Sequence, residues 1–355
     1  MLLKEVCEFR NGKAHEQYVD PDGQYILVTS KFISSDGKLY RRTNQQMTPL
    51  FRGDICMVMS DVPNGKALAK CFLVDEDNKY TLNQRIGSFT VDNRFDKKYF
   101  YYLMNRNKYF LSFNDGNGQT NLRKDDILKF TFDYIPIEDQ HSIVQKLDKL
   151  KEIIEKRQHE LQTFDELIKA RFVEMFGDVD LALQKPDWVS ISKIGTVVGG
   201  STPKTSVEEY WNGEHRWISP AELKDDSGII YDSVKKITKA GIDSCSLQEL
   251  PAGTVILSSR APIGKVAIAG NTFYCNQGFK NIICNDCILP RYLYTLLLFN
   301  TDYLNSLGRG ATFKEISKSI VENIKIPLPS VNEQERFIEF VEQVDKSKVV
   351  VQKCI

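Results

Sequence analysis

Apolar side chains recur at alternating steps of four and three residues along the charged stretch 138–177, which ends at a glycine. This spacing places the apolar side chains on one seam of a helix, as in a coiled coil. At 1.5 Å per residue, the seam is about 50 Å long. Arg157 and Arg171 interrupt it. The predicted seam residues are Ile143, Leu147, Leu150, Ile154, Leu161, Phe164, Ile168 and Met175.

The last segment, 331–355, carries the same spacing over a shorter length. Phe337, Val341, Val344 and Val351 fall on it, and Lys348 interrupts it. Because an apolar seam needs a partner, the two helices could pair antiparallel within the chain. The alternative is that each helix lies on its own globule. The length and regularity of 138–177 favour the coiled coil.

The segments before each helix show a different pattern, with short β-branched and apolar runs punctuated by Gly or Pro. The runs QYILV (24–28), ICMVM (55–59), TVILSS (254–259) and KVAIA (265–269) are typical of strands. Aromatic-rich stretches at 97–113 and 290–304 each predict one compact helix. The sequence therefore predicts an α+β protein with two similar β-rich domains, 1–137 and 181–330. Each is followed by a helix, the long one over 138–180 and a shortened one over 331–355.

The two halves of the chain also resemble each other residue by residue. Seven blocks recur in the same order, which chance pairing of glycines and prolines does not explain. Gly53, Ser60, Pro63, Gly65 and Lys66 correspond to Gly253, Ser259, Pro262, Gly264 and Lys265, and Asn83-Gln84 corresponds to Asn276-Gln277. The stretch IPIEDQHSIVQKL at 135–147 corresponds to LPSVNEQERFIEFV at 328–341. We interpret the chain as two copies of one unit.

This order of elements resembles the specificity (S) subunit of type I restriction-modification systems. The resemblance is carried by TPK at 202–204, WISP at 217–220, the block 253–270, NQG at 276–278 and the Pro-x-x-x-Glu-Gln junction at 329–334. The first copy shows the same signature more weakly. The resemblance covers essentially the whole chain.

The resemblance implies that each β-rich domain is a target recognition domain and reads one half of a bipartite double-stranded DNA site. It implies that the helices set the distance between the half-sites and dock two modification (M) subunits. The M subunits would bring S-adenosylmethionine for adenine methylation, and restriction (R) subunits would bring ATP-driven cleavage with Mg²⁺. The chain itself would be non-catalytic and without a cofactor. One departure is that the second helix is shorter than the first, which bears on docking at its side.

Charge and composition permit this interpretation without requiring it. The chain has 47 basic and 47 acidic residues. Residues 1–137 and 181–330 lean slightly basic, and the two helical segments lean acidic. No apolar run approaches the ~20 residues of a membrane span, and the first residues lack a secretory pattern. The eight cysteines show no disulfide framework, so we expect reduced thiols and a cytoplasmic protein.

No catalytic, cofactor or metal site is predicted. The chain lacks the Asn/Asp-Pro-Pro-aromatic loop and the Gly-rich turn of an adenine methyltransferase. Its Gly-Lys pairs lack the remaining residues of a phosphate-binding loop. The lone Cys284-x-x-Cys287 pair falls short of the four ligands of structural zinc. Lys66 and Lys265 are expected at the tips of strand-joining turns, where each could meet a DNA phosphate.

The repeated Asn-Gln pairs are candidates for DNA contact. Side-chain amides can pair bidentately with adenine, and Arg85 and Lys280 follow closely in sequence. However, residues that recur in both copies suit a shared structural role better than the reading of two different half-sites. The base-reading and structural interpretations of Asn83, Gln84, Asn276 and Gln277 both stay open.

Residues that differ between the copies are the better candidates for reading sequence. They are basic or polar and stand in Gly- or Ser-rich contexts typical of loops, but base readers and phosphate binders look alike at this level. The candidates are Arg41, Arg42, Lys204, Thr205, Arg260, Arg309 and Lys314. Two alternatives to a specificity subunit are a scaffolding protein, with duplicated protein-binding modules on a coiled coil, and, less favoured, an enzyme with an unrecognised site.

Overall fold

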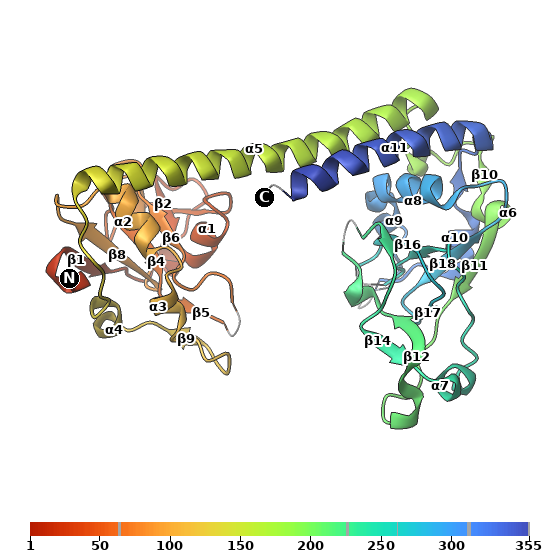
Figure 1. The fold of residues 1–355 in the computed structure, drawn as a ribbon, viewed down its shortest axis with the longest axis horizontal. Coiled ribbons are helices and arrows are strands. Elements are labelled where there is room, and N and C mark those ends of the chain that lie inside the picture. Colours follow the sequence, from red (N-terminus) through yellow and green to blue (C-terminus); the bar gives the residue numbers. More distant parts are fainter. Residues whose placement is uncertain (63–64, 225–226, 261, 311–313, 354–355) are drawn as a thin grey trace. The chain divides into compact units, whose positions relative to one another are not determined.

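The structure is a computed structural model that describes residues 1–62, 65–224, 227–260, 262–310 and 314–353 (Figure 1). Its contacts divide the chain into two units, Met1–Ile154 (unit 1) and Glu155–Ile355 (unit 2). The long helix α5 (Ile137–Phe176) contributes its first part to unit 1 and its remainder to unit 2.

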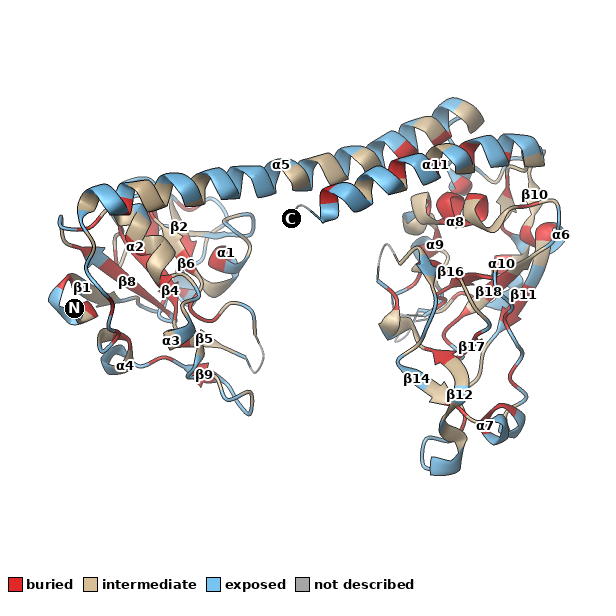
Figure 2. Ribbon diagram, viewed as in Figure 1, coloured by how far each residue is buried: buried red, intermediate tan, exposed pale blue. Residues whose placement is uncertain are grey.

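Unit 1 is built on an antiparallel sheet of four strands. Its order is β1 (Cys7–Asn11), β8 (Ile86–Val91), β4 (Ile55–Val58) and β6 (Cys71–Leu73). The continuous apolar run of β4 is explained by burial on both faces (Figure 2). Ile55 and Met57 belong to the cluster formed with the helices, whereas Cys56 and Val58 belong to a second cluster formed with the neighbouring sheet.

The second sheet of unit 1 has the order β3 (Arg41–Thr43), β2 (Tyr25–Val28) and β7 (Tyr80–Leu82). Strand β2 pairs antiparallel with β3 and parallel with β7. A short antiparallel ribbon joins β5 (Ser60–Asp61) to β9 (Thr120–Asn121). The remaining helices are η1 (Leu3–Glu5), η2 (Glu16–Tyr18), α1 (Ser30–Ser34), α2 (Lys97–Met104), α3 (Lys108–Leu111) and α4 (Lys124–Leu128).

Unit 2 repeats this plan with additions. Its main sheet has the order β11 (Gly195–Gly199), β18 (Lys280–Cys284), β15 (Val255–Leu257), β16 (Val266–Ala269) and β13 (Ile229–Ile230). Its second sheet has the order β14 (Lys235–Ile237), β12 (Trp211–Ile218) and β17 (Tyr274–Cys275), and β10 (Val189–Ser190) pairs with β19 (Lys325–Ile326). The helices are η3 (Leu181–Leu183), α6 (Ile191–Ile194), η4 (Glu208–Tyr210), η5 (Pro220–Glu222), α7 (Lys239–Ser244), α8 (Pro290–Phe299), α9 (Thr301–Ser306), α10 (Lys318–Asn323) and α11 (Val331–Gln352).

The predicted duplication is confirmed by the strand pairing. The order β1-β8-β4-β6 matches β11-β18-β15-β16, and in each second sheet one neighbour of the central strand is antiparallel and the other parallel. One detail of the alignment was wrong. The backbone amide of Leu122 donates to Met59 O, and that of Ile316 donates to Ser259 O, so Ser60 is equivalent to Arg260 rather than to Ser259.

The compact helix predicted after each sheet is in fact two short helices. In unit 1, α2 ends before Arg106, which has a positive φ of 52°, and the Asn107 side chain caps α3. In unit 2, Asn300 separates α8 from α9. Its side-chain Nδ2 donates to Leu296 O, and its Oδ1 accepts from Leu181 N. Asparagine favours such breaks because its side chain competes for backbone hydrogen bonds.

The long helix predicted over 138–177 is present as α5, and the shorter one is present as α11. Each begins with a buried glutamine that ties it to its own unit. Gln140 accepts from Asp96 N at 2.8 Å and donates to Arg94 O and Ile135 O. Gln334 accepts from Leu289 N at 2.8 Å and donates to Cys287 O and Pro329 O. Both side chains are fully buried, and the oxygen and nitrogen of each amide have hydrogen-bond partners, as buried polar groups require.

Residues three to ten positions after these glutamines have different environments in the two helices. On α11, Phe337, Val341 and Val344 are buried in the core of unit 2. The equivalent residues on α5 are Ile143, Leu147 and Leu150; the first two are half-buried, and Leu150 is 56% exposed.

The C-terminal part of α5 contacts α11 within unit 2. The ring of Phe172 lies 5.3 Å from that of Phe337, and Lys348 Nζ lies 2.5 Å from an Asp165 oxygen. Phe172 is buried, although the heptad spacing placed Arg171 on the seam. An α-helix has 3.6 residues per turn, so its contact face drifts from a strict 3.5-residue spacing. Of the predicted α5 seam, Ile168 is buried, Leu161, Phe164 and Met175 are half-buried, and Ile154 is exposed.

Among the helices of the described chain, none combines the length and apolar character needed to cross a membrane.

Candidate nucleic-acid interface

The repeated asparagines close a turn at the same place in each unit. Asn83 Oδ1 accepts from Arg85 N at 3.3 Å, and Asn276 Oδ1 accepts from Gly278 N at 2.8 Å. Their backbone amides donate to Val28 O and Ile218 O, at the ends of equivalent strands. Such self-closed Asx turns favour the structural interpretation of both asparagines.

The glutamines that follow them are exposed. Gln277 accepts from Thr202 Oγ1 at 2.5 Å, which orients it toward the TPK stretch. No side-chain partner of Gln84 is found in the described part of the chain, so its amide is available to a ligand. The pairs thus divide into a structural asparagine and an accessible glutamine.

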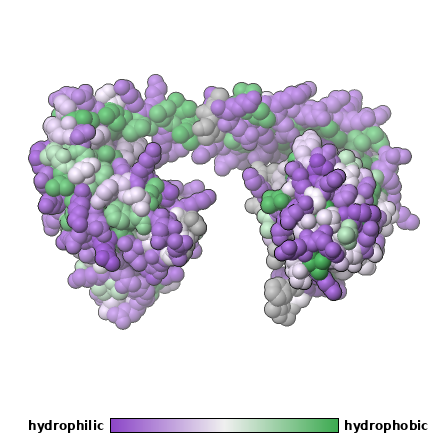
Figure 3. All heavy atoms as spheres, turned by 60° about the horizontal axis from the view of Figure 1, so that its bottom comes forward, coloured by the Kyte–Doolittle hydropathy of each residue, from purple (hydrophilic) through white to green (hydrophobic). Residues whose placement is uncertain are grey.

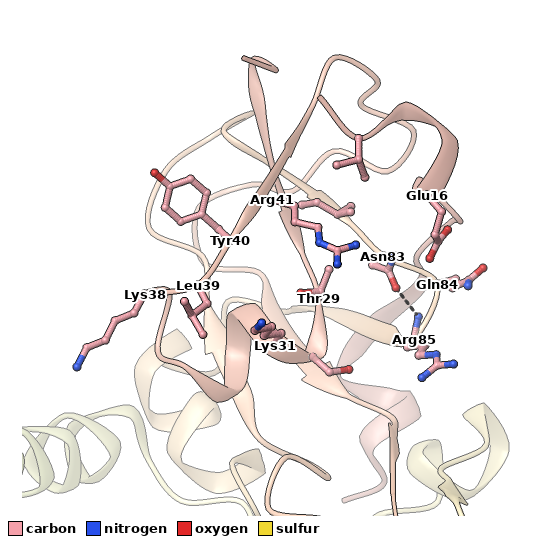
Figure 4. A pocket seen from close by; sticks show the side chains of 13 residues that line it. Glu16, Thr29, Lys31, Lys38, Leu39, Tyr40, Arg41, Asn83, Gln84 and Arg85 are labelled. Carbon is pink, nitrogen blue, oxygen red and sulfur yellow. Dashed lines mark hydrogen bonds between the residues drawn. The ribbon is translucent and has the colours of Figure 1, made fainter. Parts of the chain in front are cut away.

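A hollow of about 480 Å³ opens beside the Asn83 turn in unit 1. Figure 4 shows the guanidinium of Arg41 directed into it, toward Asn83, whereas Lys38 and Tyr40 point away. The predicted residues Arg41, Asn83, Gln84 and Arg85 therefore come together. Its other lining residues are Glu16, Val19, Leu27, Thr29, Ser30, Lys31, Lys38, Leu39 and Tyr40.

The electrostatics of the hollow favour an anion. Lys31, Arg41 and Arg85 line it with one carboxylate, Glu16, and the side chain of Lys38, which also borders it, points away. None of these four cations forms an ion pair with any residue that the structure describes. Unpaired cations clustered at a concave surface create a positive potential there, which attracts the phosphates of a nucleic acid. Sequence analysis missed Lys31, which lies in α1, and Lys38, which follows the turn at Gly37.

Arg42 is hydrogen-bonded within unit 1 and is not among the residues that line the hollow. It alternates with Arg41 along β3, donates to Gly23 O at 3.2 Å and lies over the ring of Tyr40. Alternation along a strand sends neighbouring side chains to opposite faces, so Arg41 alone of this pair reaches the hollow.

The two turn lysines differ. Lys66 is exposed, whereas Lys265 turns inward and donates to Leu223 O at 2.6 Å. The Gly264 turn itself joins β15 to β16 with a positive φ of 89°, as expected for a glycine turn. Lys66 therefore suits a phosphate contact better than Lys265.

The remaining candidates of unit 2 lie on its exposed loops. Lys204, Thr205, Arg309 and Lys314 are all exposed. Lys204 O accepts from Trp211 Nε1 at 3.2 Å, which fixes the TPK loop through its backbone and leaves the ammonium outside. In the view of Figure 3, the surface of each unit is mainly hydrophilic.

Arg260 and Lys280 are brought together by a residue that sequence analysis missed, Glu315. Arg260 lies 2.8 Å from one carboxylate oxygen and Lys280 lies 3.2 Å from the other. The hydrogen bond from Arg260, together with the one from Lys280, holds the pKa of Glu315 below its usual value. Glu315 directly follows the candidate Lys314, but its pairing across the loop is not visible in sequence.

Taken together, the geometry defines a class of protein: a duplicated α+β protein whose two units share a frame and differ in their charged and polar surface residues. Comparison with known proteins identifies its family. The model of the type I restriction modification DNA specificity domain matches residues 1–163 and 186–353. The chain therefore belongs to the family of type I restriction modification DNA specificity domains.

Relatives support this placement. The chain is similar to the type I restriction enzyme MjaIX specificity subunit of Methanocaldococcus jannaschii, with 38% identity over 53% of this chain and 46% of the relative. It is also similar to the EcoR124I/EcoR124II specificity subunit of Escherichia coli, with 30% identity over 45% of this chain and 41% of the relative. Each of these similarities spans less than half of the relative's length.

Solved structures share the fold. One, described as the structural basis of complex assembly and conformational transition of the type I R-M system, has a TM-score of 0.61 at 18% identity. It covers 100% of this chain and 91% of that chain. The S subunit from M. genitalium has a TM-score of 0.51 at 15% identity and covers 99% of this chain and 90% of that chain.

Proposed function

We propose that this chain is the non-catalytic DNA specificity subunit of a type I restriction-modification complex. Each unit reads one half of a bipartite double-stranded DNA site. One observation carries the proposal: the same fold occurs twice, with a shared frame and with different exposed residues at equivalent surface positions. A protein that recognises one ligand twice would repeat those residues.

In unit 1 the DNA contacts centre on the hollow, through Arg41, Gln84, Arg85 and the neighbouring Lys31. Lys66 contacts the backbone. In unit 2 they centre on Lys204, Thr205, Arg309 and Lys314 in the loops, with Arg260 beside them. The cations other than Arg260 contact mostly phosphates, whereas the Gln84 amide and Arg260 contact base edges.

The recognition domains on this proposal are 1–137 and 181–330, and the helical segments 138–180 and 331–355 are the spacer. We infer that α5 and α11 pair as an antiparallel coiled coil. Support comes from two contacts in opposite chain order, Phe172 with Phe337 and Asp165 with Lys348.

The partners follow from the family. Two M subunits dock on the spacer and supply S-adenosylmethionine for adenine methylation, and R subunits supply ATP- and Mg²⁺-dependent cleavage. This chain supplies the address and no cofactor, and the complex works in the cytoplasm.

The test is to express the chain with an M subunit of its family and to map adenine methylation across a genome. We expect one split motif with a methylated adenine. A variant that removes cations of the hollow in unit 1, R41A/R85A, should weaken methylation at that motif. Loss of all methylation in the wild type, combined with failure to capture the M subunit, would support the scaffold alternative and contradict the proposal.

A further inference from the structure

The short ribbon at the edge of each unit carries opposite chemistry at one structural position. In unit 1, Ser60 lies opposite Asn121 across the β5–β9 ribbon. In unit 2, Arg260 lies opposite Glu315. In both units, the backbone amide of the next residue donates across the ribbon: Leu122 N donates to Met59 O in unit 1, and Ile316 N donates to Ser259 O in unit 2. The two pairs therefore occupy equivalent positions.

In unit 1 this position is neutral and rich in amides. Gln119 Nε2 donates to Ser60 Oγ at 2.7 Å and lies 3.4 Å from Asn121 Oδ1. Asn121 and Gln119 are exposed. Figure 1 shows the ribbon at the face of unit 1 farthest from α5, where a long ligand can reach it.

In unit 2 the same position is ionic. The guanidinium of Arg260, with its side chain 46% exposed, lies beside the Glu315 carboxylate, which is 33% exposed. Lys280 is 13% exposed and bonds both Glu315 and Ser259 Oγ, the latter at 3.3 Å. Lys280 thus anchors Glu315 from the strand below, while Arg260 stays at the surface.

We propose that this ribbon position determines base specificity in both units, so that unit 1 reads an A·T pair there and unit 2 reads a G·C pair. The inference rests on the proposed function and deepens it. The major groove admits a two-stranded ribbon. Amide side chains pair bidentately with adenine N6 and N7, and an arginine fork pairs with guanine O6 and N7.

Unit 2 offers a donor fork and an acceptor side by side. A G·C pair presents two acceptors on guanine next to the N4 donor of cytosine, so Arg260 and Glu315 match it as a pair. A carboxylate has about four acceptor sites, so Glu315 can keep Arg260 and Lys280 while accepting from cytosine. Arg260 and Glu315 are the specificity-determining residues, and Lys280 is a positioning residue.

The first test exchanges the chemistry of unit 2 for that of unit 1 in the complete complex with the M subunit. R260S/E315N places serine and asparagine where unit 1 carries them. We expect one G·C position in one half of the methylated motif to lose its preference about 5- to 100-fold, while the other half stays unchanged. In unit 1, N121A removes one amide of the ribbon and should relax an A·T position in the other half.

A charge-matched control is available on α7. Lys239 and Asp243 form an exposed ion pair at 2.8 Å, so K239S/D243N removes the same charges and should leave the motif unchanged. A wild-type complex that methylates no split motif would refute the proposed function. A wild type with a split motif and an R260S/E315N variant with the same base preferences would refute only this inference.

A second measurement does not depend on the variant complex assembling. The wild-type complex is offered duplexes of its own motif in which each guanine in turn is replaced by 7-deazaguanine, which lacks the N7 acceptor. We expect one such replacement to weaken binding at least about fivefold. Unchanged binding at every guanine of both halves would overturn the inference.

A further variant, R260K, keeps the positive charge but not the two-pronged guanidinium. It should lose the same base preference as R260S/E315N.

Discussion

Units 1 and 2 have the same frame but present different surfaces. The sheet orders correspond, an asparagine closes the same turn in each unit, and a buried glutamine ties each helix to its own unit. The units differ in the residues of the ribbon, in the exposure of the turn lysine, and in how deeply the equivalent apolar residues of α5 and α11 are buried. The shared features depend mostly on hydrogen bonds to the backbone, and most of the differing features are surface side chains. The comparison indicates that the fold can keep its structure while its surface residues change.

The largest expected difference concerns the helices. Phe337 is fully buried among the rings of Phe172 and Phe176, so F337A should destabilise unit 2 by about 4 kcal/mol through lost transfer energy and a cavity. The equivalent I143A should cost unit 1 only about 1 kcal/mol, because Ile143 is half-buried. Denaturant unfolding of both variants measures the two values.

The three tryptophans make this comparison clean. Trp188, Trp211 and Trp217 all lie in unit 2, so tryptophan fluorescence reports that unit alone, while far-UV circular dichroism reports both. Equal destabilisation by F337A and I143A would show that Phe337 and Ile143 are equally buried, contrary to the structure.

The glutamines should give a smaller and symmetric effect. Q140L and Q334L each leave one backbone amide and two backbone carbonyl groups without the glutamine as a partner, which should cost about 3 kcal/mol in the unit concerned. Q334L should shift the fluorescence transition and Q140L should not. Q145L, at an exposed position on α5, is the control and should change neither.

DNA affinity should distinguish the hollow of unit 1 from the structural arginine next to it. R41A should weaken binding of the complete complex about fivefold and lower the slope of log affinity against log salt concentration by about one, as the loss of one phosphate contact requires. R42A should change stability rather than the salt slope, because Arg42 is bonded to Gly23 O. Identical salt slopes for R41A and the wild type would remove Arg41 from the interface.

The smallest expected effect is a pH dependence confined to unit 2. Because hydrogen bonds from Arg260 and Lys280 hold the pKa of folded Glu315 below its unfolded value, its contribution is present above the unfolded-state pKa and is lost as the pH falls through the folded pKa. For a pair this exposed, the contribution is below about 1 kcal/mol.

E315Q should therefore lower the stability of unit 2 slightly at pH 7 and match the wild type in strong acid. Tryptophan fluorescence during denaturation at several pH values checks this. Unit 1, with Ser60 and Asn121 at the equivalent position, should show no such term, and N121A offers the matched comparison there.

The sequence predicted what depends on local periodicity. The helix expected over 138–177 is found at Ile137–Phe176, and the duplication was visible in the order of short blocks. The sheet order was not predictable, because it depends on pairing between strands far apart in the chain. Local competition by Asn107 and Asn300 split helices that apolar content alone would have made continuous.

The candidate site was predicted only in part for the same reason. Arg41 and Arg85 were named from composition, but their meeting beside Lys31 requires the turn at Asn83 to return next to β2. Glu315 was missed because its role depends on a bridge to Arg260 across 54 intervening residues. The offset between the copies shifts by a residue there, which also explains the wrong pairing of Ser60 with Ser259.

The backbone bonds that close the ribbons have a consequence for how such a protein changes over generations. Leu122 N to Met59 O and Ile316 N to Ser259 O do not depend on which side chains stand at the neighbouring surface positions. A change of codon at position 60, 121, 260 or 315 therefore alters the contact chemistry at little cost to folding. On the proposed function, such a protein can acquire a new base preference while it keeps its fold, and the preferences of units 1 and 2 can change independently.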